Sequence, residues 1–423
     1  MTSDPRALRS VKEAMLYDPA RHEPLRPLAW DESQVRATIE HIVLDTESRF
    51  TEERYWPLHP LDREGDETAE VETPMYHGAC GVVWALSYLQ DVGAAKLSRV
   101  YHGELDRLLE LNRAWLGKAA ELHRASFIMG QTPIRMMSFG RDPTEEVESA
   151  LDALIAGNTE HPSRELMWGS PGTLLAASFL HERTGKQRWA DLFRATAAKL
   201  WSQLEWFSQH GCSLWTQDLY GRRSVLLGAV HGFVGTALPL IRGRHLLEAG
   251  AWSAWERCIV ETVRRTAQRL GPHVNWRSML DGPPVDKKLL QICHGSPGFV
   301  VCLADLPGTE LDDLLLAAGE TIWAAGPLAK GSNLCHGTGG NGYAFLKLYR
   351  RTGDSLWLER ARSFAMRGIA QAREDAARHR QWRYSLWTGD LGLAIYLRDC
   401  LHAEGRFPTL DVFYGGRGQG TVA

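Results

Sequence analysis

The sequence lacks the features that would assign it to a membrane or to nucleic acid. No uninterrupted apolar run reaches the roughly 18 residues that a membrane-spanning helix needs. No long basic run occurs, and the formal net charge of −3 argues against nucleic acid or an anionic membrane as the main partner. The polar first residues, MTSDPRALRSVKEAMLYDPARHEP, contain no apolar stretch of a secretory signal. We therefore expect a protein that is not transmembrane and binds no nucleic acid.

Cysteine is sparse, and its seven positions are an odd number scattered along the chain. Such a set favours a reducing compartment over a disulfide framework, so we expect a cytoplasmic protein. Apolar residues at 44% and charged residues at 23% are typical of a globular chain. The 423 residues allow either two domains or one large barrel-like domain.

A motif recurs along the chain: Gly-x-x-Gly followed by an apolar, helix-like run. Its first glycines are spaced unevenly, by 39 to 63 residues, which fits a closed ring with variable outer loops better than a solenoid. Six clear copies and one degraded copy, in which Pro133 replaces the second glycine, lie at 76–86, 168–180, 231–241, 293–303, 335–346, 387–397 and 127–137.

Amphipathic stretches alternate with these motifs, for example at 186–207, 252–270 and 355–379. The runs after the glycines are apolar on all sides, as helices buried inside other helices are, and no sustained period-two pattern indicates a sheet. We predict an all-α fold, an α/α toroid in which seven inner and seven outer helices form a double ring. The Gly-x-x-Gly turns lie at the inner-helix N-termini, and so all face one end. Residues 71–423 form this domain, and residues 1–70 are an extension that either covers the barrel mouth or stays mobile.

Cysteine and histidine gather at these glycines. If the motifs share one end of the barrel, two thiolates and an imidazole form a Cys₂His set that suits Zn²⁺ and leaves a fourth position open, as in catalytic sites. The alternative is that the cysteines are small buried hydrophobic residues, which two copies at equivalent repeat positions disfavour. We expect His77 and Cys80 of the first copy to serve packing. The residues directly before the first glycines include His77, His231, Cys293, His294, Cys335 and His336.

The ordered motifs resemble those of the lanthionine synthetase C (LanC) and LanC-like family over roughly 70–423. GRFPTLDVFY, near the C-terminus, is similar to the tail of the eukaryotic LanC-like members, so the chain resembles that branch more closely. The motifs that carry the resemblance are ELMWGSPG (165–172), GAVHGFVG (228–235), CHGSPG (293–298), KGSNLCHGTGGNGYAFL (330–346) and YSLWTGDLGLAIYL (384–397).

The resemblance implies one Zn²⁺ per chain, held by Cys293, Cys335 and His336. It implies that His231 is the general acid or base near the metal. Glu165 stands where bacterial cyclases have an acidic residue, and it either orients His231 or favours a helix dipole. The resemblance also implies that His294 is no ligand and instead supports the catalytic set or contacts substrate.

The resemblance further implies cationic residues that bind substrate. Lys330 matches a lysine that the LanC-like branch places near its thiol substrate. Arg378, Arg380 and Arg383 lie where that branch has an arginine, and the alignment does not choose between them. An arginine that precedes the first zinc cysteine in lantibiotic cyclases has no match in 286–293, which weighs against ring closure.

The implied activity is zinc-dependent addition of a thiol to dehydroalanine or dehydrobutyrine. The partners are a dehydrated peptide or protein and a thiol, which is either a cysteine of the same peptide or glutathione. An alternative is a non-catalytic protein that binds zinc or glutathione as a signalling or scaffold component. An α/α barrel acting on sugars or isoprenoids ranks last, since paired carboxylates or an Asp-rich metal motif are not found at the glycine turns.

Overall fold

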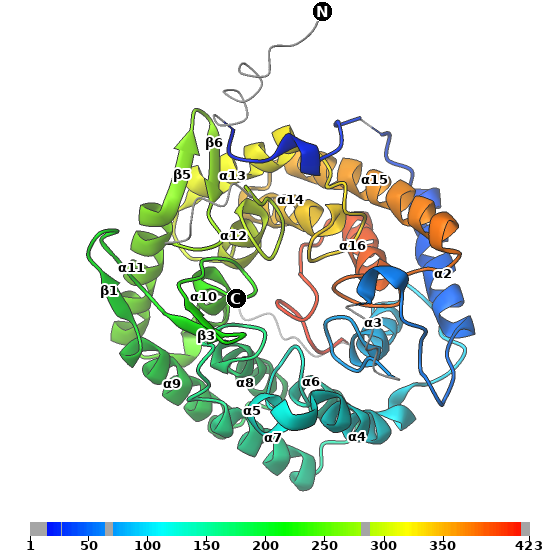
Figure 1. The fold of residues 1–423 in the computed structure, drawn as a ribbon, viewed down its shortest axis with the longest axis horizontal. Helices are drawn as coiled ribbons and strands as arrows, with labels where there is room; N and C mark the ends of the chain where they lie inside the picture. Colours follow the sequence, from blue (N-terminus) through cyan, green and yellow to red (C-terminus); the bar gives the residue numbers. More distant parts are fainter. Residues whose placement is uncertain (1–14, 27, 64–70, 281–287, 416–423) are drawn as a thin grey trace, which may run out of the picture.

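The chain folds into two concentric rings of helices (Figure 1). The structure, a computed structural model, describes residues 15–26, 28–63, 71–280 and 288–415. Within these ranges seven inner helices are surrounded by seven outer ones, which confirms the predicted α/α toroid.

The inner ring is closed, because each inner helix contacts the next and α16 contacts α3. Its helices are buried on nearly every side, as their uniformly apolar sequences predict. The inner helices are α3 (Ala79–Asp91), α6 (Thr132–Arg141), α8 (Ser170–Thr184), α10 (Phe233–Arg242), α12 (Ser296–Leu303), α14 (Thr338–Thr352) and α16 (Asp390–His402).

The outer helices are amphipathic and bury one face against the inner ring. The longest is α15 (Ser355–His379). Its N-cap is Asp354, whose side chain accepts a hydrogen bond from the Leu356 amide (3.0 Å). The other outer helices are α2 (Glu32–Ser48), α4 (Leu105–Leu116), α7 (Glu145–Gly157), α9 (Gln187–Ser202), α11 (Ala249–Thr266) and α13 (Asp312–Ala325); a short α5 (Ala120–His123) lies beside them.

The second glycine of each clear motif is required by close backbone contact. In all six copies, a Cβ there would lie 1.8–2.4 Å from the carbonyl oxygen six residues earlier, closer than any side chain permits. At Gly340, for example, the carbonyl of Leu334 would be 1.8 Å away. This contact folds the loop before each inner helix tightly onto the helix N-terminus. The first glycine is the N-cap in those six repeats, and their loops face one end of the ring, as predicted.

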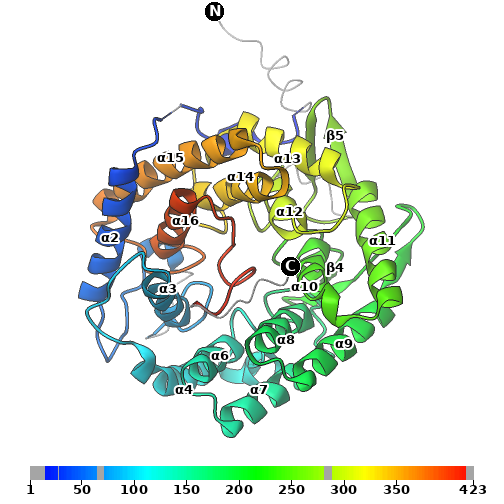
Figure 2. The same cartoon turned by 180° about the vertical axis from the view of Figure 1, so that it is seen from behind.

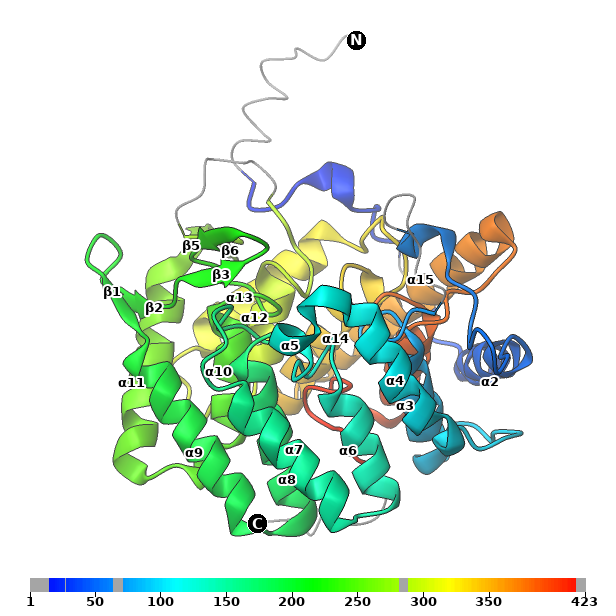
Figure 3. The same cartoon turned by 60° about the horizontal axis from the view of Figure 1, so that its bottom comes forward.

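In the part of the chain that the structure describes, three short antiparallel hairpins interrupt the helical pattern, and no sequence pattern predicted them. Figure 3 shows β3, β5 and β6 at one end of the ring, together with α5. The strands pair as β1 (Glu205–Phe207) with β2 (Cys212–Leu214), β3 (Gln217–Leu219) with β4 (Arg222–Ser224), and β5 (Ala267–Leu270) with β6 (His273–Trp276). Among the described residues, no helix has the length and apolarity to cross a membrane.

The two end segments of the described chain are not part of the helical repeats, and they lie at opposite ends of the ring. Residues 15–26 pair with the loop before α14, through an antiparallel bridge between His22 and Leu328. Residues 403–415 cross the middle of the ring at its opposite end, as Figure 2 shows from behind. There Asp411 pairs with the fully buried Lys347 (2.7 Å), and the carbonyl of Phe413 accepts a hydrogen bond from Trp84 (2.8 Å).

Candidate functional site

A cavity of about 980 Å³ opens among the loops that precede the inner helices. Part of its wall is formed by equivalent positions of the repeats, because in six of the seven repeats the residue directly before the first glycine lines the cavity. These equivalent positions of the ring face one space, although they are far apart in sequence. The six residues are His77, Met129, Trp168, His231, His336 and Thr388.

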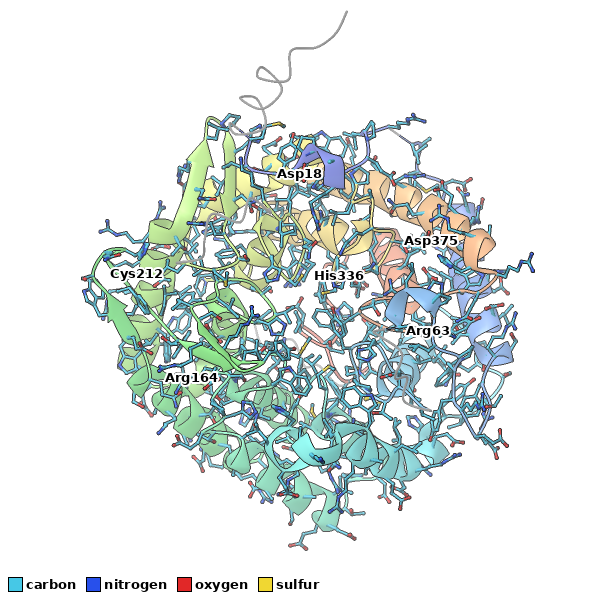
Figure 4. All side chains as sticks on the ribbon, in the orientation of Figure 1. Asp18, Arg63, Arg164, Cys212, His336 and Asp375 are labelled. Carbon is cyan, nitrogen blue, oxygen red and sulfur yellow. The ribbon has the colours of Figure 1, made fainter. Side chains whose placement is uncertain are left out.

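Two cysteines and one histidine meet beside this cavity. The possible ligand atoms of Cys293, Cys335 and His336 all lie within 4.8 Å of one another. Both cysteines are buried, and His336 is half-buried and faces the cavity (Figure 4). Two sulfurs and one imidazole nitrogen at this separation are a donor set that could hold a zinc ion.

Local backbone contacts bring these three side chains together. The amide of Cys335 donates to the carbonyl of Trp387 (2.9 Å), which ties α14's loop to that of α16. The amide of His336 donates to Oδ1 of Asn333 (2.9 Å). On the other loop, Gln291 and His294 exchange backbone hydrogen bonds of 3.0 Å, so Cys293 sits in a tight turn.

The electrostatic environments of the three groups differ. The hydrogen bond with Cys335 is the largest influence on Cys293 and, against burial, lowers the pKa of this thiol. Burial raises the pKa of Cys335 well above its usual value. One sulfur of the pair is therefore more readily ionised than the other. Burial, together with the charges of Lys330 and Arg383, lowers the pKa of His336 to about 4, so its imidazole is neutral and able to ligate near pH 7.

His231 and Glu165 form a buried pair on the same wall. Nδ1 of His231 lies 2.8 Å from Oε2 of Glu165, whose side chain is fully buried, whereas 18% of the His231 side chain is exposed. Glu165 also accepts hydrogen bonds from Ser163 and from the amides of Met167 and Trp168 (3.1, 3.0 and 2.7 Å). Burial alone lowers the pKa of His231, but the hydrogen bond and charge of Glu165 outweigh it, and the pKa is raised.

His294 does not line the cavity, and the backbone explains why. Gly295 has φ +98, whereas the other five N-cap glycines have φ between −94 and −135. This left-handed residue turns the preceding peptide differently from its counterparts. Burial and the charge of His231 lower the pKa of His294 to about 4, and its Nδ1 has no hydrogen-bond partner among the described residues.

The predicted cations lie at different places. Lys330, Arg378 and Arg383 line the cavity, whereas Arg380 is the exposed C-cap of α15. Arg383 is already paired through two nitrogens with Asp62. Arg378 pairs with Asp375 (3.2 Å), which Figure 4 labels on α15. Lys330 is exposed, and no hydrogen bond or ion pair binds its ammonium among the described residues.

Sequence reasoning missed several residues of the site. Tyr76 lines the cavity with its hydroxyl 3.4 Å from Nε2 of His336. Its signal was present, because Tyr76-His77-Gly78 has Tyr where two other copies, at 293–295 and 335–337, read Cys-His-Gly. His77, expected in packing, instead reaches the cavity and pairs with Glu72 (3.0 Å). Cys80 is completely buried in α3, which confirms its packing role.

Comparison with known proteins identifies relatives of the chain. Residues 69–412 match the family model described as lanthionine synthetase C-like protein. The glutathione S-transferase LANCL1 of Danio rerio is 33% identical over 207 residues, which are 47% of this chain and 47% of that protein. The LanC-like protein GCL1 of Arabidopsis thaliana is 28% identical over 261 residues, 59% of this chain and 58% of that protein. The chain therefore aligns with about half the length of these curated relatives.

The fold also has a counterpart of known structure. Nisin cyclase superposes with a TM-score of 0.59 over 91% of this chain and 100% of that chain, at 16% sequence identity. At this identity the likeness shows a shared fold alone.

Proposed function

The chain belongs to the lanthionine synthetase C-like family, and on that premise we propose a zinc-dependent enzyme that forms thioethers. It adds a thiol to the β-carbon of a dehydroalanine or dehydrobutyrine residue in a peptide or protein. The observation that carries the proposal is the Cys₂His cluster beside a cavity that also exposes a carboxylate-held histidine.

Zinc fits the cluster by the chemistry of its donors. Cys293, Cys335 and His336 supply three ligand atoms within 4.8 Å of one another, and a three-residue set leaves one position for a substrate. When bound, zinc would lower the pKa of an incoming thiol so that thiolate is available near neutral pH. The seven cysteines are free thiols, which supports a reducing, cytoplasmic location for the protein.

His231 would be the group that transfers a proton in the reaction. The thiol loses its proton, its sulfur bonds to the β-carbon, and the α-carbon gains a proton as the carbon–carbon double bond is consumed. Glu165 occupies Nδ1 of His231, which leaves Nε2 as the ring atom available to a substrate. The raised pKa keeps more of this imidazole protonated near neutrality, as a general acid requires.

Lys330 would be the main anchor for an acidic thiol such as glutathione. Arg383 and Arg378 carry carboxylate partners, Asp62 and Asp375, whereas the Lys330 ammonium carries none among the described residues. An unpaired cation beside the cavity favours a thiol that carries its own carboxylate. We therefore propose glutathione addition ahead of ring closure by a cysteine of the same peptide.

The test is a direct assay of the purified full chain. We expect stoichiometric zinc, and addition of glutathione to a dehydroalanine peptide that Cys335→Ala abolishes along with the metal. A peptide that carries its own cysteine, offered without glutathione, tests ring closure in parallel. A wild-type protein without zinc refutes the proposal, and a zinc-loaded protein that forms neither thioether is instead a binding protein.

A further inference from the structure

The N-terminal segment 15–26 lies outside the family match, yet it contacts both loops that carry the cysteine and histidine cluster. Residues 15–26 precede the matched stretch 69–412. Figure 1 shows this dark-blue segment against the yellow elements that precede α14. The residue of this segment whose side chain reaches toward the cluster is Arg21.

The segment is held in place by backbone contacts. The amide of Glu23 donates to the carbonyl of Pro327 (2.8 Å), and the amide of Ala329 donates to the carbonyl of Arg21 (2.9 Å). A Cβ on Gly326, which has φ +82, would lie 2.5 Å from the carbonyl of Glu23. A glycine is therefore required where the segment crosses this loop.

Arg21 continues from this segment to the other ligand loop. Its Nη2 donates to Oε1 of Gln291 (3.1 Å), and Nε2 of Gln291 lies 2.9 Å from Sγ of Cys293. Gln291 is 4% exposed, and its backbone is fixed by the paired hydrogen bonds with His294. Arg21 and Gln291 are 270 residues apart in sequence.

The hydrogen bond from Arg21 determines which end of the Gln291 side-chain amide faces the Cys293 sulfur. A guanidinium has only donors, so it must meet the amide oxygen, and the amide NH₂ is then directed at Sγ. Without Arg21, the amide is free to rotate and present its oxygen to the sulfur, which repels a thiolate. An N–H donor stabilises a thiolate, and groups that support metal ligands in this way commonly affect metal affinity by about 10- to 100-fold.

We propose that Arg21 is a positioning residue for the metal site, acting through Gln291 on the Cys293 sulfur. The proposal rests on the zinc site proposed above. It assigns part of the site to a segment that the family's matched stretch does not contain.

The test measures Zn²⁺ release from the zinc-loaded full chain to a chromogenic chelator. We expect Arg21→Met and Gln291→Met each to speed release by about 10- to 100-fold. The double variant should release no faster than the faster single variant, because both changes remove the same N–H donation. Arg26→Met, at an exposed arginine of the same segment, is the matched control and should release zinc at the wild-type rate.

Two further measurements separate positioning from general loosening. Gln291→Glu keeps a partner for Arg21 but has no N–H to donate, so it should release zinc at least as fast as Gln291→Met. In the Co²⁺-substituted protein, the thiolate-to-cobalt absorption band should shift in the same direction in Arg21→Met and Gln291→Met. Arg21→Met that behaves like Arg26→Met, or effects that multiply in the double variant, would overturn the inference alone. A wild-type chain that binds neither Zn²⁺ nor Co²⁺ would overturn the proposed function as well.

Discussion

Replacing Glu165 by glutamine should expose how strongly the fold depends on one buried carboxylate. The two oxygens of Glu165 accept four hydrogen bonds, from His231 Nδ1, Ser163 Oγ and the amides of Met167 and Trp168. Glutamine offers one oxygen and an NH₂ group. Whichever way its amide turns, one backbone N–H faces another donor and loses its acceptor.

The cost follows from these contacts. A buried donor left without an acceptor costs about 1–3 kcal/mol, and loss of the charge-assisted bond with His231 costs about 1.5–3 kcal/mol. We expect Glu165→Gln to lower the free energy of unfolding by about 3–5 kcal/mol. Glu182→Gln is the control, because Glu182 pairs with Arg242 at the surface, where such a pair contributes about 0–1 kcal/mol.

The loss should also depend on pH, with a sign set by His231. Its pKa in the folded protein is raised, so its protonation stabilises the fold. This contribution is complete below the ordinary pKa of about 6.5 and is lost as pH rises through the folded value. In Glu165→Gln both contributions of Glu165 are lost, so burial, which lowers the His231 pKa, is opposed by the charge of Cys293 without them. The difference between wild type and variant should therefore be larger at about pH 6 than at about pH 9.

Urea unfolding followed by circular dichroism at both pH values measures this difference. Glu182→Gln should show a small loss that is the same at both pH values. A Glu165→Gln loss below about 1 kcal/mol, or one that does not change with pH, would refute the account of the pair.

Three other predictions concern separate parts of the molecule. Gly295→Ala places a Cβ 2.3 Å from a carbonyl oxygen at φ +98, and it should cost about 3 kcal/mol or more in urea unfolding and reduce zinc content. Lys347→Met leaves the carboxylate of Asp411, whose side chain is 10% exposed, with the Phe407 amide but without its ammonium partner, and should cost about 3–5 kcal/mol by the same measurement; a loss below about 1 kcal/mol would contradict this. Lys330→Met should raise the KM for glutathione by about tenfold or more, with kcat nearly unchanged. Arg378→Met, which removes an already paired cation, should change that KM by less, and equal effects would count against Lys330 as the anchor.

The repeats predicted both the fold and much of the site for one physical reason. Equivalent positions in a ring face equivalent directions, so the residue before the first glycine lines the cavity in six of seven repeats. Tyr76 could have been found by extending the rule to the position two residues before the first glycine, where two other copies have the cysteines Cys293 and Cys335. His294 departs from it because only its N-cap glycine is left-handed, and a backbone angle is not written in a Cys-His-Gly motif.

Other features depend on contacts that no local pattern encodes. Strands of three or four residues are too short for a period-two signal, so the hairpins were not predicted. Arg21 reaches Gln291 across 270 residues, outside every repeat.

Among the described residues, the C-terminal segment lies across the end of the ring opposite the cavity. Residues 403–415 contact inner helices around the ring, through Trp84, Met136, Arg242 and Lys347, at the end opposite the cavity. A polypeptide that reaches the cavity would therefore enter and leave by the same end of the ring. A dehydrated residue would have to arrive at a chain end or on a flexible bend.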